Sequence, residues 1–180
     1  LAAGVGFSIR GGILGDWGGQ FGFTQSDLGK ITGGGLTGFG IIILIGSLLA
    51  DRVGYGKLMI LAFLMHVGSA VVTLAATPLF NSMGGLESEA AKNAAFQCLF
   101  WGMFMFAIGN GLAEAVVNPL PAVLFPKEKT HYLNILHAGW PGGLIVGASL
   151  SYFMVGKVRW EIQIALFLIP AIIYGLMLWG

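Results

Sequence analysis

Apolar residues form long stretches along the chain, and polar residues gather in short segments between them. Five stretches contain 19 to 24 residues, which matches the roughly 20 residues that a helix needs to cross about 30 Å of hydrocarbon. A sixth, at the start of the chain, is shorter and is expected to be the truncated outer part of a spanning helix. The pattern predicts an all-α membrane protein with six transmembrane helices, over residues 1–15 (partial), 28–50, 57–77, 95–117, 132–155 and 162–180.

The polar segments predict where these helices begin and end. Residues 16–27 are rich in glycine and are expected to form an exposed loop. Its last residues, Thr24 to Asp27, have the spacing of a capping box and indicate a helix start. Proline lacks a backbone donor and its ring clashes with the preceding turn, so the third span should end at Pro78 and the fourth should break at Asn118-Pro119. The longest polar segment, residues 78–93, is expected to lie in water.

Composition supports a membrane protein and excludes several other classes. Hydrophobic residues make up 56% of the 180 residues and charged residues only 9%, against about 25% charged residues in a soluble domain. A net charge of +1 provides no basic surface for nucleic acid. The single cysteine, Cys98, excludes an internal disulfide framework, and neither a metal-ligand spacing nor a cofactor motif is present. Because the chain starts in an apolar run without Met, we expect it to be a piece of a longer protein.

The fourth predicted span carries a polar stripe. Asn110, Glu114 and Asn118 are four residues apart, so a helix places them on one face, about 6 Å from one to the next. An acid near the bilayer centre costs about 2.5–3.5 kcal/mol on insertion scales and should therefore face the bundle interior or a wet cavity. Burial favours the neutral form of such a carboxyl group, so Glu114 could load and release a proton if its hydration changes. The alternative is that the stripe only joins helices by hydrogen bonds.

Other polar residues within the spans are candidates for binding a solute. His137 and Trp140 share a face of the fifth predicted span with Asn134, where an imidazole and an indole could bind a sugar; the alternative is an interior His and an interfacial Trp. Arg10 lies in the first span and needs a partner, either Glu114 or an anionic substrate, unless its side chain extends to the outer interface. His66, in the third span, is interpreted as a lone packing residue.

The link between the second and third spans resembles a known loop signature. Leu49-Ala50-Asp51-Arg52, then Gly54, match the G-x-L-A-D-R-x-G-R-K loop of major facilitator superfamily transporters at these places. Ser47 replaces its first glycine, Tyr55 and Gly56 occupy the two basic places, and Lys57 follows one step late. The resemblance implies the N-terminal six-helix half of a twelve-helix transporter, built from two inverted three-helix repeats and truncated here at both ends. It also implies that this loop is cytoplasmic, whereas basic residues are divided four against four between the two sides and do not decide the orientation.

A narrower resemblance covers the fourth and fifth spans. Glu114-x-x-x-Asn118-Pro119, Pro126, and Leu133-Asn134 before a glycine-rich helix are similar to the pattern of the fucose:proton symporter family. This resemblance implies that Glu114 belongs to a proton and sugar pathway. The chain departs from that family at three places: His137 stands where the family has Gln, Gly139 and Trp140 replace an aromatic-Asn pair, and Arg10-Gly11 replaces a first-helix Asp.

Together these features lead to one expected function, to two alternatives and, more remotely, to a membrane sensor that does not transport. We expect a transporter of the plasma membrane that moves a small polar solute, in the first place a sugar, by proton symport, with the bilayer and the missing C-terminal half as its other partners. An importer or exchanger of organic anions that uses Arg10 is the alternative. An intramembrane enzyme using Glu114 and His137 is a remote one, because the sequence offers no nucleophile-base pair and no metal motif.

Overall fold

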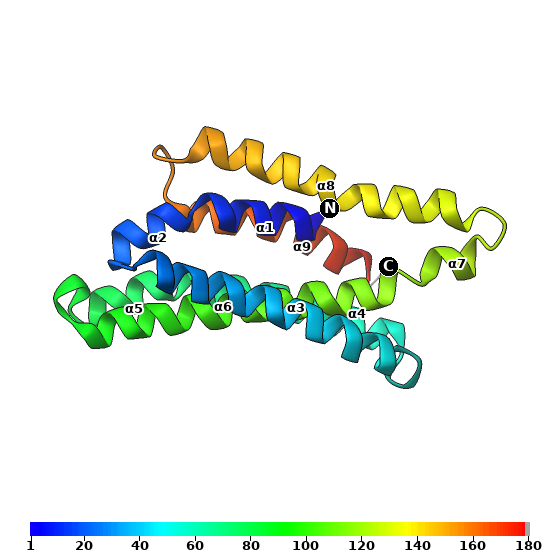
Figure 1. Ribbon diagram of the computed structural model, residues 1–180, viewed down its shortest axis with the longest axis horizontal. Helices are drawn as coiled ribbons and strands as arrows, with labels where there is room; N and C mark the ends of the chain where they lie inside the picture. The colour runs from blue at the N-terminus through cyan, green and yellow to red at the C-terminus, as the bar shows by residue number, and fades with distance from the viewer. Residues whose placement is uncertain (179–180) are drawn as a thin grey trace.

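The computed structural model describes residues 1–178, and this part of the chain folds into helices without strands (Figure 1). The longer helices lie roughly along one axis, with their connections at the two ends (Figure 1). The elements are α1 (Ala2–Gly12), α2 (Leu14–Phe21), α3 (Gln25–Val53), α4 (Tyr55–Leu74), α5 (Ala76–Ser82), the 3-10 turn η1 (Gly85–Glu87), α6 (Glu89–Val117), α7 (Leu120–Leu124), α8 (Lys129–Met154) and α9 (Trp160–Met177).

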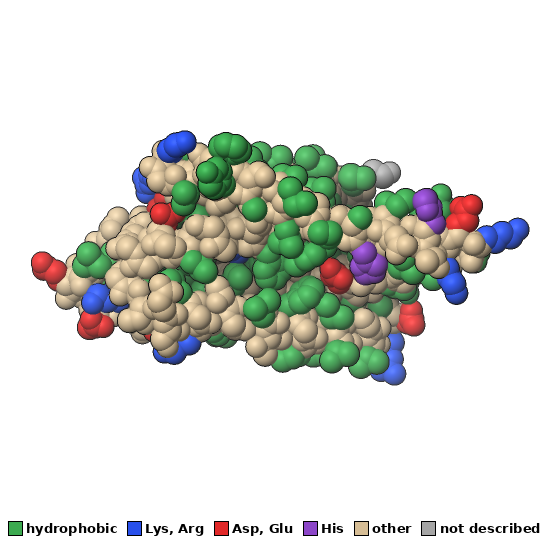
Figure 2. All heavy atoms as spheres, turned by 45° about the horizontal axis from the view of Figure 1, so that its top comes forward, with side chains coloured by type: hydrophobic (Ala, Val, Ile, Leu, Met, Phe, Trp, Pro, Cys, Tyr) green, Lys and Arg blue, Asp and Glu red, His purple; other side chains and the backbone are tan. Residues whose placement is uncertain are grey.

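Four helical segments of the described chain are long and apolar enough to cross a membrane: Gln25–Val53, Tyr55–Ser82, Glu89–Leu124 and Trp160–Met177. Helix α8 has 26 residues, but it contains histidine, asparagine and several glycines and is less apolar. Helix α1 has only 11 residues. The all-helical membrane fold is therefore confirmed, while the six-span arrangement stays a prediction. On the face seen in Figure 2, hydrophobic side chains lie over the middle and most charged side chains lie towards the two ends, as a bilayer requires.

The prediction of an exposed loop over residues 16–27 is wrong for most of that segment. Residues 14–21 form α2, and its Trp17 and Phe21 are 1% and 0% exposed. Their four-residue spacing places both rings on one helix face, against Trp160 and Phe80. The glycines of this segment lower its helix propensity, so the four-residue spacing of Trp17 and Phe21 did not indicate a helix in the sequence.

The capping box at the start of α3 is confirmed. The Thr24 hydroxyl accepts a hydrogen bond from the Asp27 backbone N–H at 3.2 Å, and the Asp27 carboxylate accepts one from the Thr24 N–H at 3.1 Å. Just before it, Gly22 ends α2 with a φ of 70°, a left-handed conformation that glycine adopts without strain.

Two proline predictions have different outcomes. The third span does not end at Pro78, because Pro78 lies in the first turn of α5. Backbone N–H groups in the first turn have no partner within the helix, so a proline is tolerated there. The non-helical part of residues 78–93 is correspondingly shorter, and α6 begins at Glu89, where the Ser88 hydroxyl accepts a hydrogen bond from the Ala91 N–H. The break after the fourth span is confirmed, because α6 ends at Val117 and the chain continues through Asn118-Pro119 into α7.

Helix α6 packs along both α3 and α4, α1 lies between α8 and α9, and α4 also contacts α9. Small residues allow these helices to approach closely. On α3, Gly38 faces the ring of Phe104 in α6. On α8, a Cβ at Gly147 would lie 2.7 Å from the Val5 carbonyl oxygen and 2.9 Å from the Ser8 Cβ of α1. Van der Waals packing of this kind replaces the hydrophobic effect as the force between helices in lipid.

Gly147→Ala should destabilise the fold by about 2 kcal/mol, because the added methyl group meets backbone that cannot yield. Gly142→Ala, on the same helix, is the matched control, since in the described chain no atom outside its own helical turn lies within 4 Å of a Cβ there. Thermal unfolding in detergent, followed by circular dichroism, should show a lower midpoint for Gly147→Ala alone. Equal midpoints for the two variants would contradict the close α1–α8 contact.

Candidate functional site

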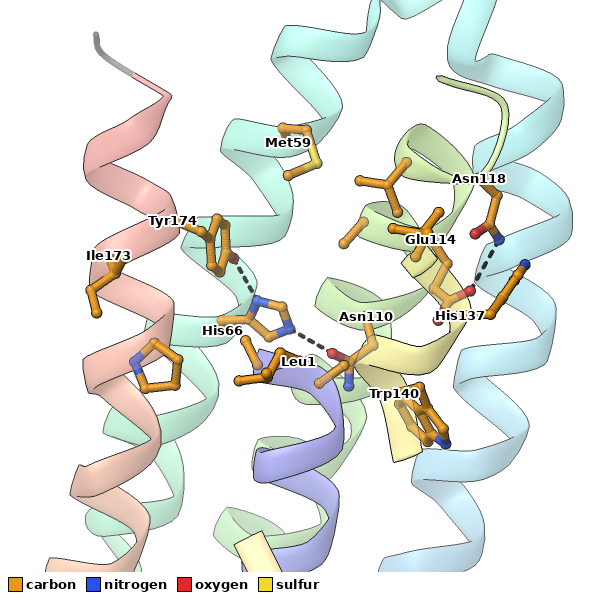
Figure 3. A pocket seen from close by; sticks show the side chains of 16 residues that line it. Leu1, Met59, His66, Asn110, Glu114, Asn118, His137, Trp140, Ile173 and Tyr174 are labelled. Atoms are coloured by element: carbon orange, nitrogen blue, oxygen red, sulfur yellow. Dashed lines mark hydrogen bonds between the residues drawn. The ribbon is translucent and has the colours of Figure 1, made fainter. Parts of the chain in front are cut away.

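A cavity of about 490 Å³ opens between the helices and is lined by 16 residues of α1, α4, α6, α8 and α9 (Figure 3). Its volume lies in the range that holds a small ligand. Most of the lining is apolar, and Leu1, Met59, Leu136 and Ile173 are examples. The side chains in this wall that can form hydrogen bonds are His66, Asn110, Glu114, Asn118, His137, Trp140 and Tyr174.

The predicted stripe on α6 lies on the cavity wall. Asn110 is fully buried, and Glu114 and Asn118 are half-buried. The Asn118 amide donates a hydrogen bond to Glu114 Oε2 at 3.0 Å (Figure 3). Within residues 1–178, no basic group lies within ion-pair distance of Glu114. The carboxyl group therefore lines the cavity with one neutral hydrogen-bond partner.

Asn110 connects this stripe to two residues that the sequence did not identify as functional. Its Oδ1 lies 3.0 Å from His66 Nε2, and His66 Nδ1 is hydrogen-bonded to the hydroxyl of Tyr174 (Figure 3). His66 is buried and packed, as interpreted, but it is not a lone residue, because both ring nitrogens form hydrogen bonds. No local signal could have found this chain of contacts, since its members are 44 and 108 residues apart and only the packing of α4, α6 and α9 joins them.

The three candidates on α8 are divided between the cavity and the surface. His137 and Trp140 line the cavity, and Asn134 does not, although His137 and Asn134 are both exposed. Trp140 packs edge-to-face on Phe7 with centroids 5.2 Å apart and stacks on Phe39 at 6.4 Å. These contacts hold the indole at the wall, where aromatic faces can stack on an apolar part of a ligand.

Arg10 does not line the cavity, although it is buried. Its guanidinium group donates to the Ser69 hydroxyl at 2.9 Å and to the Gly6 carbonyl at 3.2 Å. It also lies 3.8 Å from the centroid of the Phe106 ring. Arg10 does not pair with Glu114, and its side chain does not extend to the outer interface. The faces of aromatic rings stabilise the guanidinium charge in place of an acid.

The loop signature forms the turn between α3 and α4. Leu49, Asp51 and Arg52 belong to the last turn of α3, Gly54 links the helices with a φ of 94°, and Lys57 lies in the first turn of α4. The Tyr55 hydroxyl donates to Asp51 Oδ1 at 3.1 Å. A smaller cavity, of about 260 Å³, is lined by this pair together with Glu114 and Asn118.

The described helices bring no three His, Cys, Asp or Glu side chains close enough together to hold a metal ion. The side chains that line the cavity offer hydrogen-bonding groups, aromatic rings and one carboxyl group. This set can bind a polar, uncharged molecule.

Comparison with known families gives one match: the family model described as Major Facilitator Superfamily covers residues 1–180. No curated protein and no solved structure gives a significant match to the chain. The match supports the broader of the two resemblances, and nothing found supports the narrower one to fucose:proton symporters.

The contacts of Arg10 give a prediction about its partner. Arg10→Gln should lower the thermal stability in detergent, because Ser69 and the Phe106 ring lose their contacts with the guanidinium group. Adding Glu114→Gln should not restore the lost stability. The changes in unfolding free energy of the two single variants should add to within about 0.5 kcal/mol in the double variant, as for residues without a shared contact. A double variant clearly more stable than Arg10→Gln alone would show that the two charges interact.

Proposed function

Since the chain belongs to the Major Facilitator Superfamily, whose members are membrane transporters, we propose that it moves a small polar solute, in the first place a sugar, by proton symport with alternating access. The observation that carries the proposal is Glu114, a carboxyl group on a cavity wall whose only hydrogen-bond partner in the described chain is the neutral Asn118.

The proposal includes the architecture of half a transporter with two inverted repeats. Helix contacts support it, because α1 packs on α8 and α9 as α6 packs on α3 and α4. A two-fold axis that exchanges residues 1–82 with residues 89–177 would produce these matching helix contacts. The contact between α4 and α9 would then lie on that axis. The solute would then move between this unit and a second, C-terminal half in the plasma membrane as the two rock against each other.

Proton coupling requires that Glu114 is neutral in one conformation and ionised in another, because an acid fixed in one form transmits no gradient. Closure of the cavity around the solute would dry the carboxyl group and favour its protonated form. Opening on the other side would hydrate it and release the proton. Asn118 would hold the carboxyl group in both states, since its amide donates to either form.

The lining of the cavity favours a sugar over an organic anion. An indole and an imidazole beside amide groups suit a molecule that combines apolar faces with hydroxyl groups. The anion alternative depended on Arg10, whose guanidinium group is directed into the protein between α1, α4 and α6. The enzyme alternative has no support, because members of the superfamily are transporters.

Glu114→Gln tests the coupling role. The variant keeps the size of the side chain and fixes the neutral form, so it should insert normally and still exchange solute for solute in proteoliposomes. Accumulation driven by a pH gradient should disappear. Glu128→Gln, an exposed acid beside α8, is the control and should accumulate solute normally. If Glu114→Gln still concentrates solute with protons as the only driving force, Glu114 is not the coupling group.

The proposed orientation places residues 51–57 and 127–131 in the cytoplasm and residues 78–93 outside. Glu87 and Lys127 are exposed, so each can be replaced by cysteine in a Cys98→Ser background. A membrane-impermeant thiol reagent applied to whole cells should label Glu87→Cys at once and Lys127→Cys only after permeabilisation. The reverse pattern would invert the proposed topology.

A further inference from the structure

We infer that Tyr174, His66 and Asn110 form a directional hydrogen-bond relay that presents the Asn110 amide NH₂ group to the transported solute. Its effect is to require an acceptor oxygen on that solute. The part that concerns the solute rests on the proposed function, whereas the direction of the relay can be tested without any ligand.

The relay crosses three helices beside the cavity. His66 of α4 lies between Tyr174 of α9 and Asn110 of α6, and all three residues line the cavity (Figure 3). The imidazole is held in place on its other sides by the rings of Phe106 and Phe167, with centroids 5.7 and 5.5 Å away. A Cβ at Gly109 would lie 2.7–2.8 Å from the imidazole, so the glycine provides the space that the ring occupies.

The donors and acceptors fix the direction of the relay. The Asn110 Oδ1 atom can only accept, so His66 Nε2 must carry the proton and donate to it. A neutral imidazole then has an unprotonated Nδ1, which accepts the hydrogen bond from the Tyr174 hydroxyl. The Arg10 guanidinium group packs on the same Phe106 and Phe167 rings as His66, and its charge disfavours a second positive charge there.

The relay leaves the Asn110 nitrogen free. Asn110 is fully buried, and its Nδ2 atom has no hydrogen-bond partner within residues 1–178. A buried amide donor without a partner is unfavourable, and an acceptor on a molecule in the cavity would remove that cost. Asn118 does not offer such a donor in the same way, because its amide already donates to Glu114.

Asn110 and Glu114 together define which chemical groups a solute in the cavity must carry. They lie one helical turn apart, about 6 Å along α6. Asn110 requires an acceptor, and a carboxyl oxygen of Glu114 accepts from a donor, and neighbouring hydroxyl groups of a sugar can supply both. A carboxylate could accept from Asn110 but has no hydrogen to donate to Glu114. The pair therefore selects uncharged polyhydroxy compounds against organic acids.

The direction of the relay can be measured in the whole protein without substrate. The chain has three histidines, so ¹⁵N-histidine labelling with His131→Gln and His137→Gln variants assigns the His66 imidazole signals. We expect the proton on Nε2 at neutral pH. Tyr174→Phe should shift the Nδ1 resonance, and Tyr152→Phe, which removes the hydroxyl of a tyrosine that is 78% exposed, should not. A proton on Nδ1, alone or together with Nε2, would overturn the relay, because Tyr174 would then have to accept.

The role in selectivity is tested by uptake of a panel of monosaccharides and their singly deoxygenated analogues into proteoliposomes. Asn110→Leu should raise the KM for the transported sugar about tenfold, as loss of one hydrogen bond predicts. It should not raise the KM for the deoxygenated analogue that lacks the hydroxyl group to which Asn110 donates. Tyr174→Phe should raise KM about threefold in the parent protein and have no effect in the Asn110→Leu background. A Tyr174→Phe effect that persists in that background would overturn the inference. Failure to transport any monosaccharide would reject the sugar assignment of the proposed function, while the histidine signals would still decide the relay.

Discussion

The buried guanidinium group of Arg10 is the interaction on which the arrangement of this helical unit depends. It reaches from α1 to the Ser69 hydroxyl of α4, the Phe106 ring of α6 and, at 5.0 Å, the Phe167 ring of α9. A charge without an acidic partner is costly in a membrane interior, and the cost falls only while these groups surround it. Separation of any of the four helices would leave it exposed to hydrocarbon, so the cluster holds them in one geometry.

The functional residues are built on that cluster. His66 packs on the same two phenylalanine rings as Arg10, and through Asn110 it adjoins the stripe that carries Glu114. Gly109 allows α6 to pass close to the imidazole, and Ser69 donates to the Gly102 carbonyl of α6 at 2.6 Å. The rigid side of the cavity thus consists of α4 and α6, against which α8 and α9 place His137, Trp140 and Tyr174.

What the sequence could predict depended on the range of the contacts. The stripe of Asn110, Glu114 and Asn118 and the capping box at Thr24 follow from helical spacing, and the structure contains both. Helix α2 was missed because glycines mask the Trp17–Phe21 period, although the spacing itself was present. The side chains that hydrogen-bond to Arg10 and His66 could not be predicted, because they are 44 to 108 residues away in sequence and depend on how helices pack. Asn134 shows the opposite case: its residue type suited a binding site, but it is exposed and does not line the cavity.

The single residue between α3 and α4 has a mechanical consequence. With only Gly54 between them, the two helices are tied at one end without slack, so neither can slide along its axis without pulling the other. At the same end of the molecule, α6 and α8 are joined through α7 and its flanking residues, a much longer tether (Figure 1). The two connections therefore constrain movement differently: α3 and α4 cannot shift independently at that end, whereas α8 can tilt away from α6 within the length of its connection.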